Sequence, residues 1–201
     1  EPLLQSEFIR QFRQLCGPEW RITVETSLNV PQQNVEELIS IIDNYIVDIK
    51  DMNNNIYQRY TGKNNENVIQ EVKNGRKIIV SKFNPYYLDY PYPKHSLKAA
   101  YEFEPVFHGI EGYEQNVLGV ESTLWTEWID NTDLLAFRVF PRLTAVAESA
   151  WCDKSKKDYL AFENSLKNVN KLIENTTGIK AAPLKYCNVK NPLKRAAIMM
   201  N

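Results

Sequence analysis

Apolar residues recur along this chain at two spacings, one typical of strands and one of helices. Residues 21–26 alternate polar and apolar side chains, as a half-buried strand does. Residues 45–50, 77–81 and 116–121 are short apolar runs, which we interpret as three further strands. Between the first two strands, residues 35–42 carry the i, i+3, i+4, i+7 stripe of an amphipathic helix. Strand, helix and strand in this order predict parallel pairing through a right-handed crossover.

Capping residues indicate where several helices begin and end. Asn34 and Glu37, three residues apart, predict a capping box. Residues 66–73 are followed by an Asn-Gly pair, a signal that ends a helix. Asp133 is expected to cap a helix after the fourth strand, and Pro141 to start the next one.

Two longer segments have an apolar face at helical spacing, residues 1–16 and residues 157–175. The first face consists of Leu4, Phe8, Phe12 and Leu15, and the second of Tyr159, Phe162, Leu166, Val169 and Leu172. Residues 84–92, rich in tyrosine and proline, are predicted to form a surface loop. Four strands amount to half of an eight-stranded barrel. The predicted fold is therefore α/β, a parallel-strand (βα) barrel-derived arrangement of about half a TIM barrel with C-terminal helices.

Length and charge narrow the classes of function. The 201 residues fall short of the roughly 250 typical of a complete α/β barrel. A net charge of −1 argues against a nucleic-acid partner, because nucleic-acid binders present a basic face. No apolar run approaches the roughly 18 residues that span a bilayer, so no membrane partner is expected.

Metal sites and cofactors are not expected from the cysteines and histidines. Cys16, Cys152 and Cys187 are scattered and form no CxxC pair. His95 and His108 are placed on polar loops without ligand spacing. We see no signal peptide, and the sequence opens on a glutamate, which we expect of a processed or recombined piece. The compartment is left open, and expression in the cytoplasm is compatible with the sequence.

The most informative stretch lies at the end of the fourth strand. Residues 121–127 read Glu-Ser-Thr-Leu-Trp-Thr-Glu, which places Trp125 and Glu127 two residues apart. An indole ring can stack on the C–H face of a sugar, and a carboxylate accepts hydrogen bonds from its hydroxyls. This pattern favours a carbohydrate ligand.

Residues 74–201 resemble the C-terminal part of the catalytic barrel of glycoside hydrolase family 20, the exo-β-N-acetylhexosaminidases. The resemblance is carried by the Trp-Thr-Glu strand, by Tyr86-Tyr87-Leu88-Asp89, and by residues 140–151, Phe-Pro-Arg-Leu-Thr-Ala-Val-Ala-Glu-Ser-Ala-Trp. It implies substrate-assisted hydrolysis, in which the 2-acetamido oxygen attacks the anomeric carbon. It also implies that Tyr87 orients the acetamido group, and that Asp89, Trp125 and Glu127 bind the sugar.

The catalytic acid of that family is missing from this chain. The family uses an adjacent Asp-Glu pair on an earlier strand, and no Asp-Glu dipeptide occurs here. General-acid catalysis needs a proton donor at the leaving oxygen. We therefore expect a relative that does not turn over substrate.

Residues 1–73 resemble radical S-adenosylmethionine enzymes that activate glycyl-radical proteins. The resemblance is carried by Glu1-Pro-Leu-Leu, residues 24–28, residues 45–53 and the Tyr-Thr-Gly that ends at Gly62. It implies a cofactor pocket, whose expected residues are Glu1, Glu25, Thr26, Asp48 and Lys50. The CxxxCxxC motif that ligates the iron–sulfur cluster is absent.

The two resemblances predict a chimeric chain of segments 1–73 and 74–201 within one compact domain. Three functions stay open: an N-acetylhexosamine-binding relative without turnover, a remnant that binds S-adenosylmethionine without a cluster, and a scaffold without a ligand. Four parallel strands leave two edges, which the C-terminal segment or a second copy could cover. A homodimer that closes an eight-stranded barrel is one such arrangement.

Overall fold

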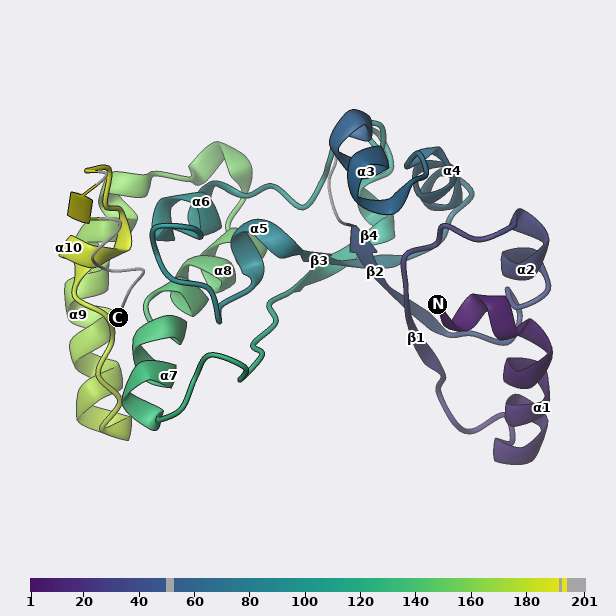
Figure 1. The fold of residues 1–201 in the computed structure, drawn as a ribbon, viewed down its shortest axis with the longest axis horizontal. Helices are drawn as coiled ribbons and strands as arrows, with labels where there is room; N and C mark the ends of the chain where they lie inside the picture. The colour runs from purple at the N-terminus through teal and green to yellow at the C-terminus, as the bar shows by residue number, and fades with distance from the viewer. Residues whose placement is uncertain (50–52, 192, 195–201) are drawn as a thin grey trace. The chain divides into compact units, whose positions relative to one another are not determined.

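The computed structural model describes residues 1–49, 53–191 and 193–194, which gather into two compact units (Figure 1). Unit 1 consists of Glu1–Phe83 and Pro105–Glu121, and unit 2 of Asn84–Glu104 and Ser122–Asn201. The units interleave along the chain. The predicted division into segments 1–73 and 74–201 describes which family each part resembles, and it stays a prediction.

Unit 1 contains a parallel four-stranded sheet in the order β1-β2-β3-β4, which confirms the predicted parallel α/β class. Its strands are β1 (Thr23–Thr26), β2 (Asn44–Ile49), β3 (Ile78–Lys82) and β4 (Val117–Glu121). Because neighbours in the sheet are also neighbours in sequence, each new strand was added to the same edge. β1 and β4 are therefore the two edge strands of this described sheet.

The two faces of this sheet differ in polarity, since successive side chains of a strand point to opposite faces. One face is apolar and buried, with Val24, Tyr45, Val47, Ile78 and Val80. Asp48 and Ser81 are register partners, as are Ser81 and Glu121, so these three side chains share the other face. Asp48, Ser81 and Glu121 lie at or next to the C-terminal ends of their strands, the end at which α/β barrels bind their ligands.

Helices and 3-10 turns complete unit 1. They are η1 (Pro2–Gln5), α1 (Ser6–Cys16), α2 (Gln32–Glu36), α3 (Asn54–Thr61), α4 (Glu66–Lys73) and η2 (Glu114–Asn116). The η1 turn contacts β1, α1 and α2, and Figure 1 shows α1 and α2 next to β1. The predicted helix 66–73 and its stop at Asn74 are confirmed.

Two predictions about these helices are wrong in detail. The capping box is absent, because α2 (Gln32–Glu36) begins two residues before Asn34 and has Pro31 at its N-cap position. Asn34 lies inside the helix, and its amide donates to the carbonyl of Leu3 at 2.9 Å instead of capping. In α1 the predicted apolar stripe is exposed, and Ile9 is buried instead. Arg13 lies one turn after Ile9 on the same side of α1 and donates to the carbonyl of Ile41 at 2.5 Å.

Unit 2 is helical in its described part. Its elements are α5 (Phe83–Tyr86, which starts at the last residue of unit 1), α6 (Leu97–Glu102), α7 (Thr132–Val139), α8 (Arg142–Trp151), η3 (Lys154–Lys156), α9 (Tyr159–Thr177) and α10 (Leu184–Cys187). α6 packs against α8 and α9. The predicted helices after Pro141 and up to Gly178 are confirmed, while the sequence pattern missed α6.

Three further predictions are wrong in unit 2. Asn131 caps α7 by accepting from the amide of Leu134 at 2.8 Å, and Asp133 lies in the first turn. Residues 84–92 do not form a surface loop, because Tyr86, Leu88 and most of their neighbours are buried. Aromatic side chains in a polar-looking segment can build a core when other helices cover them. His95 is likewise buried rather than on a polar loop.

Within the described residues, no helix combines the length and apolar character needed to cross a membrane.

Candidate functional site

Two segments of unit 2 that carry the expected sugar-binding residues run side by side. Tyr87 and Thr123 form a parallel bridge, and the amide of Leu88 donates to the carbonyl of Thr123 at 2.9 Å. The amide of Thr123 donates in turn to the carbonyl of Tyr86 at 3.2 Å. The Ser122 hydroxyl reaches the same carbonyl at 2.7 Å. This pairing brings Tyr87 close to the segment that continues to Trp125 and Glu127.

The four expected residues differ in exposure. Asp89 is only 4% exposed, and its Oδ1 has no hydrogen-bond partner among the described residues. Tyr87 is half-buried. Trp125 is 54% exposed and Glu127 is exposed as well. A buried acceptor and an exposed indole on two paired segments are features that a polar ligand with one apolar face can complete.

Arg138, at the last turn of α7, belongs to the surroundings of Asp89. Burial lowers the pKa of Arg138, and the neighbouring side chains of Tyr92 and Asp89 partly oppose that effect. The Nε of Arg138 is buried without a hydrogen-bond partner among the described residues. A guanidinium and a carboxylate that both keep a buried polar atom unsatisfied are suited to share a ligand hydroxyl or a water.

A second arginine, Arg142, forms hydrogen bonds with main-chain carbonyls of this site. Arg142 donates to the carbonyls of Leu88 at 2.5 Å and of His95 at 3.1 Å. The Nδ1 of His95 lies 2.9 Å from the carbonyl of Tyr87. Sequence reasoning missed Arg138, Arg142 and the role of His95. Arg142 lies inside the 140–151 motif, so the motif was the available signal, but spacing alone does not tell which carbonyls a buried arginine meets.

The described residues that were expected around a cofactor lie in unit 1 and fall into two groups. Glu1 and Thr26 form one group, and Glu25 and Asp48 lie on the polar face of the sheet. Glu25 and Thr26 are consecutive in β1, so their side chains point to opposite faces of the sheet. Glu1 joins Thr26 and Ser27, since its carboxylate accepts from both hydroxyls, at 2.5 and 2.6 Å. Burial raises the pKa of Glu1, but the hydrogen bonds from Ser27 and Thr26 outweigh it, and the pKa is lowered. Lys50 lies outside the described residues.

Glu25 instead belongs with the polar face of the sheet. Burial and the charge of Glu25 raise the pKa of Glu121, and a hydrogen bond with Ser81 partly offsets this. Glu121 was not among the predicted site residues. Among the described residues, no three His, Cys, Asp or Glu side chains are grouped so as to hold a metal ion.

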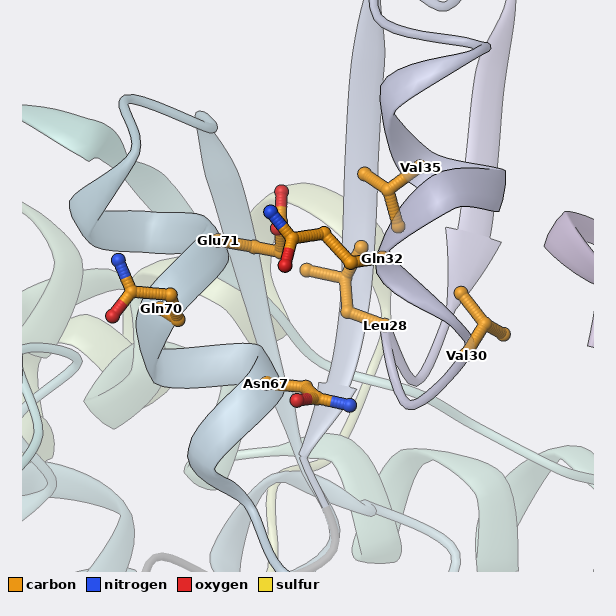
Figure 2. A pocket seen from close by; sticks show the side chains of 7 residues that line it. All are labelled: Leu28, Val30, Gln32, Val35, Asn67, Gln70 and Glu71. Carbon is orange, nitrogen blue, oxygen red and sulfur yellow. The ribbon is translucent and has the colours of Figure 1, made fainter.

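Two hollows in the units do not include the expected sugar-binding residues. A cavity of about 20 Å³ in unit 1 lies between α4, α2 and the loop before α2, and Figure 2 shows the side chains that line it. It is lined by Leu28, Val30, Gln32, Val35, Asn67, Gln70 and Glu71. This volume suits a single water and excludes a sugar. A hollow of about 340 Å³ in unit 2 is lined by Tyr92, Pro93, Lys94, Ser96, Lys98, Asn188, Val189 and Lys190.

Comparison with known proteins identifies the family. The model of glycosyl hydrolase family 20, catalytic domain, matches residues 27–154. The chain is 38% identical to the β-hexosaminidase subunit beta of Mus musculus over 114 residues, which are 54% of this chain and 20% of that relative. Against the subunit beta of Homo sapiens it is 32% identical over 130 residues, 63% of this chain and 22% of the relative. The chain thus spans about a fifth of the length of these relatives.

Solved structures show the same fold. The family 20 β-N-acetylhexosaminidase from Streptomyces coelicolor A3(2) matches with a TM-score of 0.60 at 19% identity, over 93% of this chain and 42% of that one. An exo-β-N-acetylglucosaminidase from Vibrio harveyi, solved with N-acetylglucosamine, matches with a TM-score of 0.61 at 18% identity, over 91% and 28%. The parallel sheet with its helices is thus part of a TIM-barrel-like fold. The chain belongs to glycosyl hydrolase family 20.

A further similarity concerns a different class of enzyme. The chain is 39% identical over 85 residues to the (2S)-3-sulfopropanediol dehydratase activating enzyme of Klebsiella oxytoca, which is 42% of this chain and 26% of that relative. The family 20 match begins at residue 27, inside the segment 1–73 for which the second resemblance was predicted.

Proposed function

We propose that unit 2 binds a terminal N-acetylhexosamine without hydrolysing it. Tyr87 donates to the acetamido carbonyl, Asp89 and Glu127 accept from ring hydroxyls, and the Trp125 indole stacks on the sugar. The observation that supports this most directly is the parallel pairing of Tyr87 with Thr123, which brings the two sugar-binding segments side by side. The buried Oδ1 of Asp89, without a partner among the described residues, supports a polar ligand there.

Turnover is not part of this proposal. The family relationship alone does not supply the acid, and the printed sequence holds no Asp-Glu dipeptide. Without a proton donor at the leaving oxygen, cleavage of the glycosidic bond would have a high barrier. We therefore expect no release of 4-nitrophenol from 4-nitrophenyl N-acetyl-β-glucosaminide by this chain.

The binding proposal is tested by titrating N-acetylglucosamine while following tryptophan fluorescence. The intact chain should show a saturable change, and Trp125→Ala should abolish it, because the indole that reports the sugar is removed and binding is weakened by about 1 kcal/mol. Trp151→Ala is the matched control, since Trp151 is 90% exposed on α8 and is not assigned to the site. A response that survives Trp125→Ala, or that disappears with Trp151→Ala alone, contradicts the assignment.

A second candidate function rests on the similarity to the activating enzyme. In this proposal segment 1–73 is a remnant of a radical S-adenosylmethionine enzyme, joined to the family 20 segment 74–201, and Glu1, Glu25, Thr26, Asp48 and Lys50 line its pocket. The hydroxyls around the Glu1 carboxylate favour a polar ligand at this end of β1. Titration with S-adenosylmethionine separates the candidates, and silence with both ligands favours a scaffold without a ligand.

A further inference from the structure

The backbone on both sides of Leu88 is held by hydrogen bonds from three directions. The carbonyl of Tyr87 lies 2.9 Å from Nδ1 of His95, and the carbonyl of Leu88 accepts from Nη2 of Arg142 at 2.5 Å. The amide of Leu88 donates to the carbonyl of Thr123 at 2.9 Å. A carbonyl oxygen can only accept, so His95 carries its proton on Nδ1.

These bonds define two successive peptide planes. The Tyr87 carbonyl and the Leu88 amide belong to the same rigid plane, and the Leu88 carbonyl belongs to the next. The first plane ends at the Cα of Tyr87 and the second at the Cα of Asp89. Holding both planes therefore sets where the side chains of Tyr87 and Asp89 start and in which direction they leave the backbone.

Arg142 is built into the fold at this point. Its side chain is fully buried, and it also donates to the carbonyl of Arg138, from Nη2 at 2.6 Å and from Nε at 3.0 Å. Its guanidinium carbon lies 4.4 Å from the centroid of the Tyr92 ring. One planar fork thus joins the end of α7, the Leu88 carbonyl and the carbonyl of His95, a task that the single ammonium of lysine does not reproduce.

We propose that Arg142 and His95 are positioning residues that set Tyr87 for recognition of the acetamido group and Asp89 for recognition of the ring hydroxyls. The assignment rests on the proposed function of unit 2. Neither side chain touches the ligand, and both act through main-chain carbonyls. The consequence is a specific one: losing either side chain weakens the distinction between N-acetylglucosamine and glucose, which differ in the group that Tyr87 faces.

A matched pair of substitutions at His95 isolates this role. Asparagine keeps an N–H donor close to the position of Nδ1, while leucine has nearly the same shape and no donor. In His95→Leu we expect the ratio of the two dissociation constants, glucose over N-acetylglucosamine, to fall about fivefold or more, the effect of one hydrogen bond. In His95→Asn the ratio should stay near that of the intact chain. Arg142→Lys should behave like His95→Leu.

Ser149→Ala controls for a general loss of packing. Ser149 is also buried on α8 and donates to the carbonyl of Phe103 at 2.6 Å, and its hydroxyl neighbours the side chain of Tyr86 rather than the two peptide planes at Leu88. This variant should unfold at a lower temperature without changing the sugar ratio. An equal fall of the ratio in Ser149→Ala and His95→Leu would overturn the proposal, as would an unchanged ratio in folded His95→Leu.

The exchange rate of the Leu88 amide hydrogen tests the positioning role without a bound sugar and without the Arg142→Lys variant. In His95→Leu this amide should exchange faster relative to the amides of α9, and in His95→Asn it should not. If the intact chain binds neither sugar, the proposed function fails. The positioning role is then supported by faster exchange in His95→Leu alone and overturned by equal exchange in the two variants.

Discussion

His95 is a buried titratable residue of unit 2, and its pKa makes the stability of this unit depend on pH. Its ring is 0% exposed and lies 5.0 Å from the ring of Tyr90. Burial lowers the pKa of His95 to about 4, from an ordinary value of 6.5, although the hydrogen bond with the Tyr87 carbonyl works in the opposite direction. The neutral ring is therefore the form that the folded unit requires above about pH 4.

This shift predicts a loss of stability in acid. Between pH 6.5 and pH 4 the unfolded chain takes up a proton on His95 and the folded chain does not, so the free energy of unfolding falls as the pH is lowered. The fall is at most roughly 3 kcal/mol over this range. His95→Asn has no titrating ring and should lose that part of the pH dependence. Urea unfolding of both chains at pH 7 and pH 4.5 measures the difference, and parallel curves would contradict the pKa.

Helix starts show how close a sequence pattern comes to the real boundary. The pattern placed a helix after the fourth strand but chose Asp133 as its cap, while Asn131 occupies that position. Both residue types are favourable caps, and they stand two positions apart. Which of the two residues occupies the N-cap position depends on the path of the chain before the helix, and local propensity does not describe that path.

The two residues should therefore differ in their effect on α7. Asn131→Ala removes the acceptor for the Leu134 amide and should lower the free energy of unfolding by about 1 kcal/mol. Asp133→Ala removes a first-turn charge and should cost a few tenths of a kcal/mol. Thermal unfolding of the two variants, with Asn131→Asp as the conservative control, measures this. A larger effect at Asp133 would mean that the cap lies there.

The sheet of unit 1 raises the question of what covers its edges. β1 and β4 are the edge strands of the described sheet, and parallel sheets in α/β proteins are normally closed or covered. The polar face carries Asp48, Ser81 and Glu121, as the interior of a barrel mouth can. The relatives that share this fold are longer than this chain.

We expect a second copy to cover these edges, which would close an eight-stranded barrel from two sets of four strands. Light scattering at micromolar concentration should then give twice the 23.4 kDa of one chain. A replacement of Val24 in β1 by proline removes an amide from that strand and should shift the mass toward one chain, while proline in the exposed 153–156 segment should not. A monomeric mass for the intact chain would contradict the proposal.

The periodic pattern of the chain was enough for the parallel α/β class, for all four strands within two residues and for α9, because burial of apolar side chains imposes those periods. Signals at helix ends, the Asn-Gly pair at residue 74 and Pro141, indicated α4 and α8. The Trp-Thr-Glu and Tyr-Leu-Asp motifs, together with residues 140–151, were enough for the family. The pattern did not reveal that Arg142, Arg138 and His95 gather around Leu88 and Asp89, or that the apolar stripe of α1 is exposed. Those outcomes depend on which segments meet after folding, and a buried guanidinium or imidazole finds its acceptors among carbonyls far away in sequence.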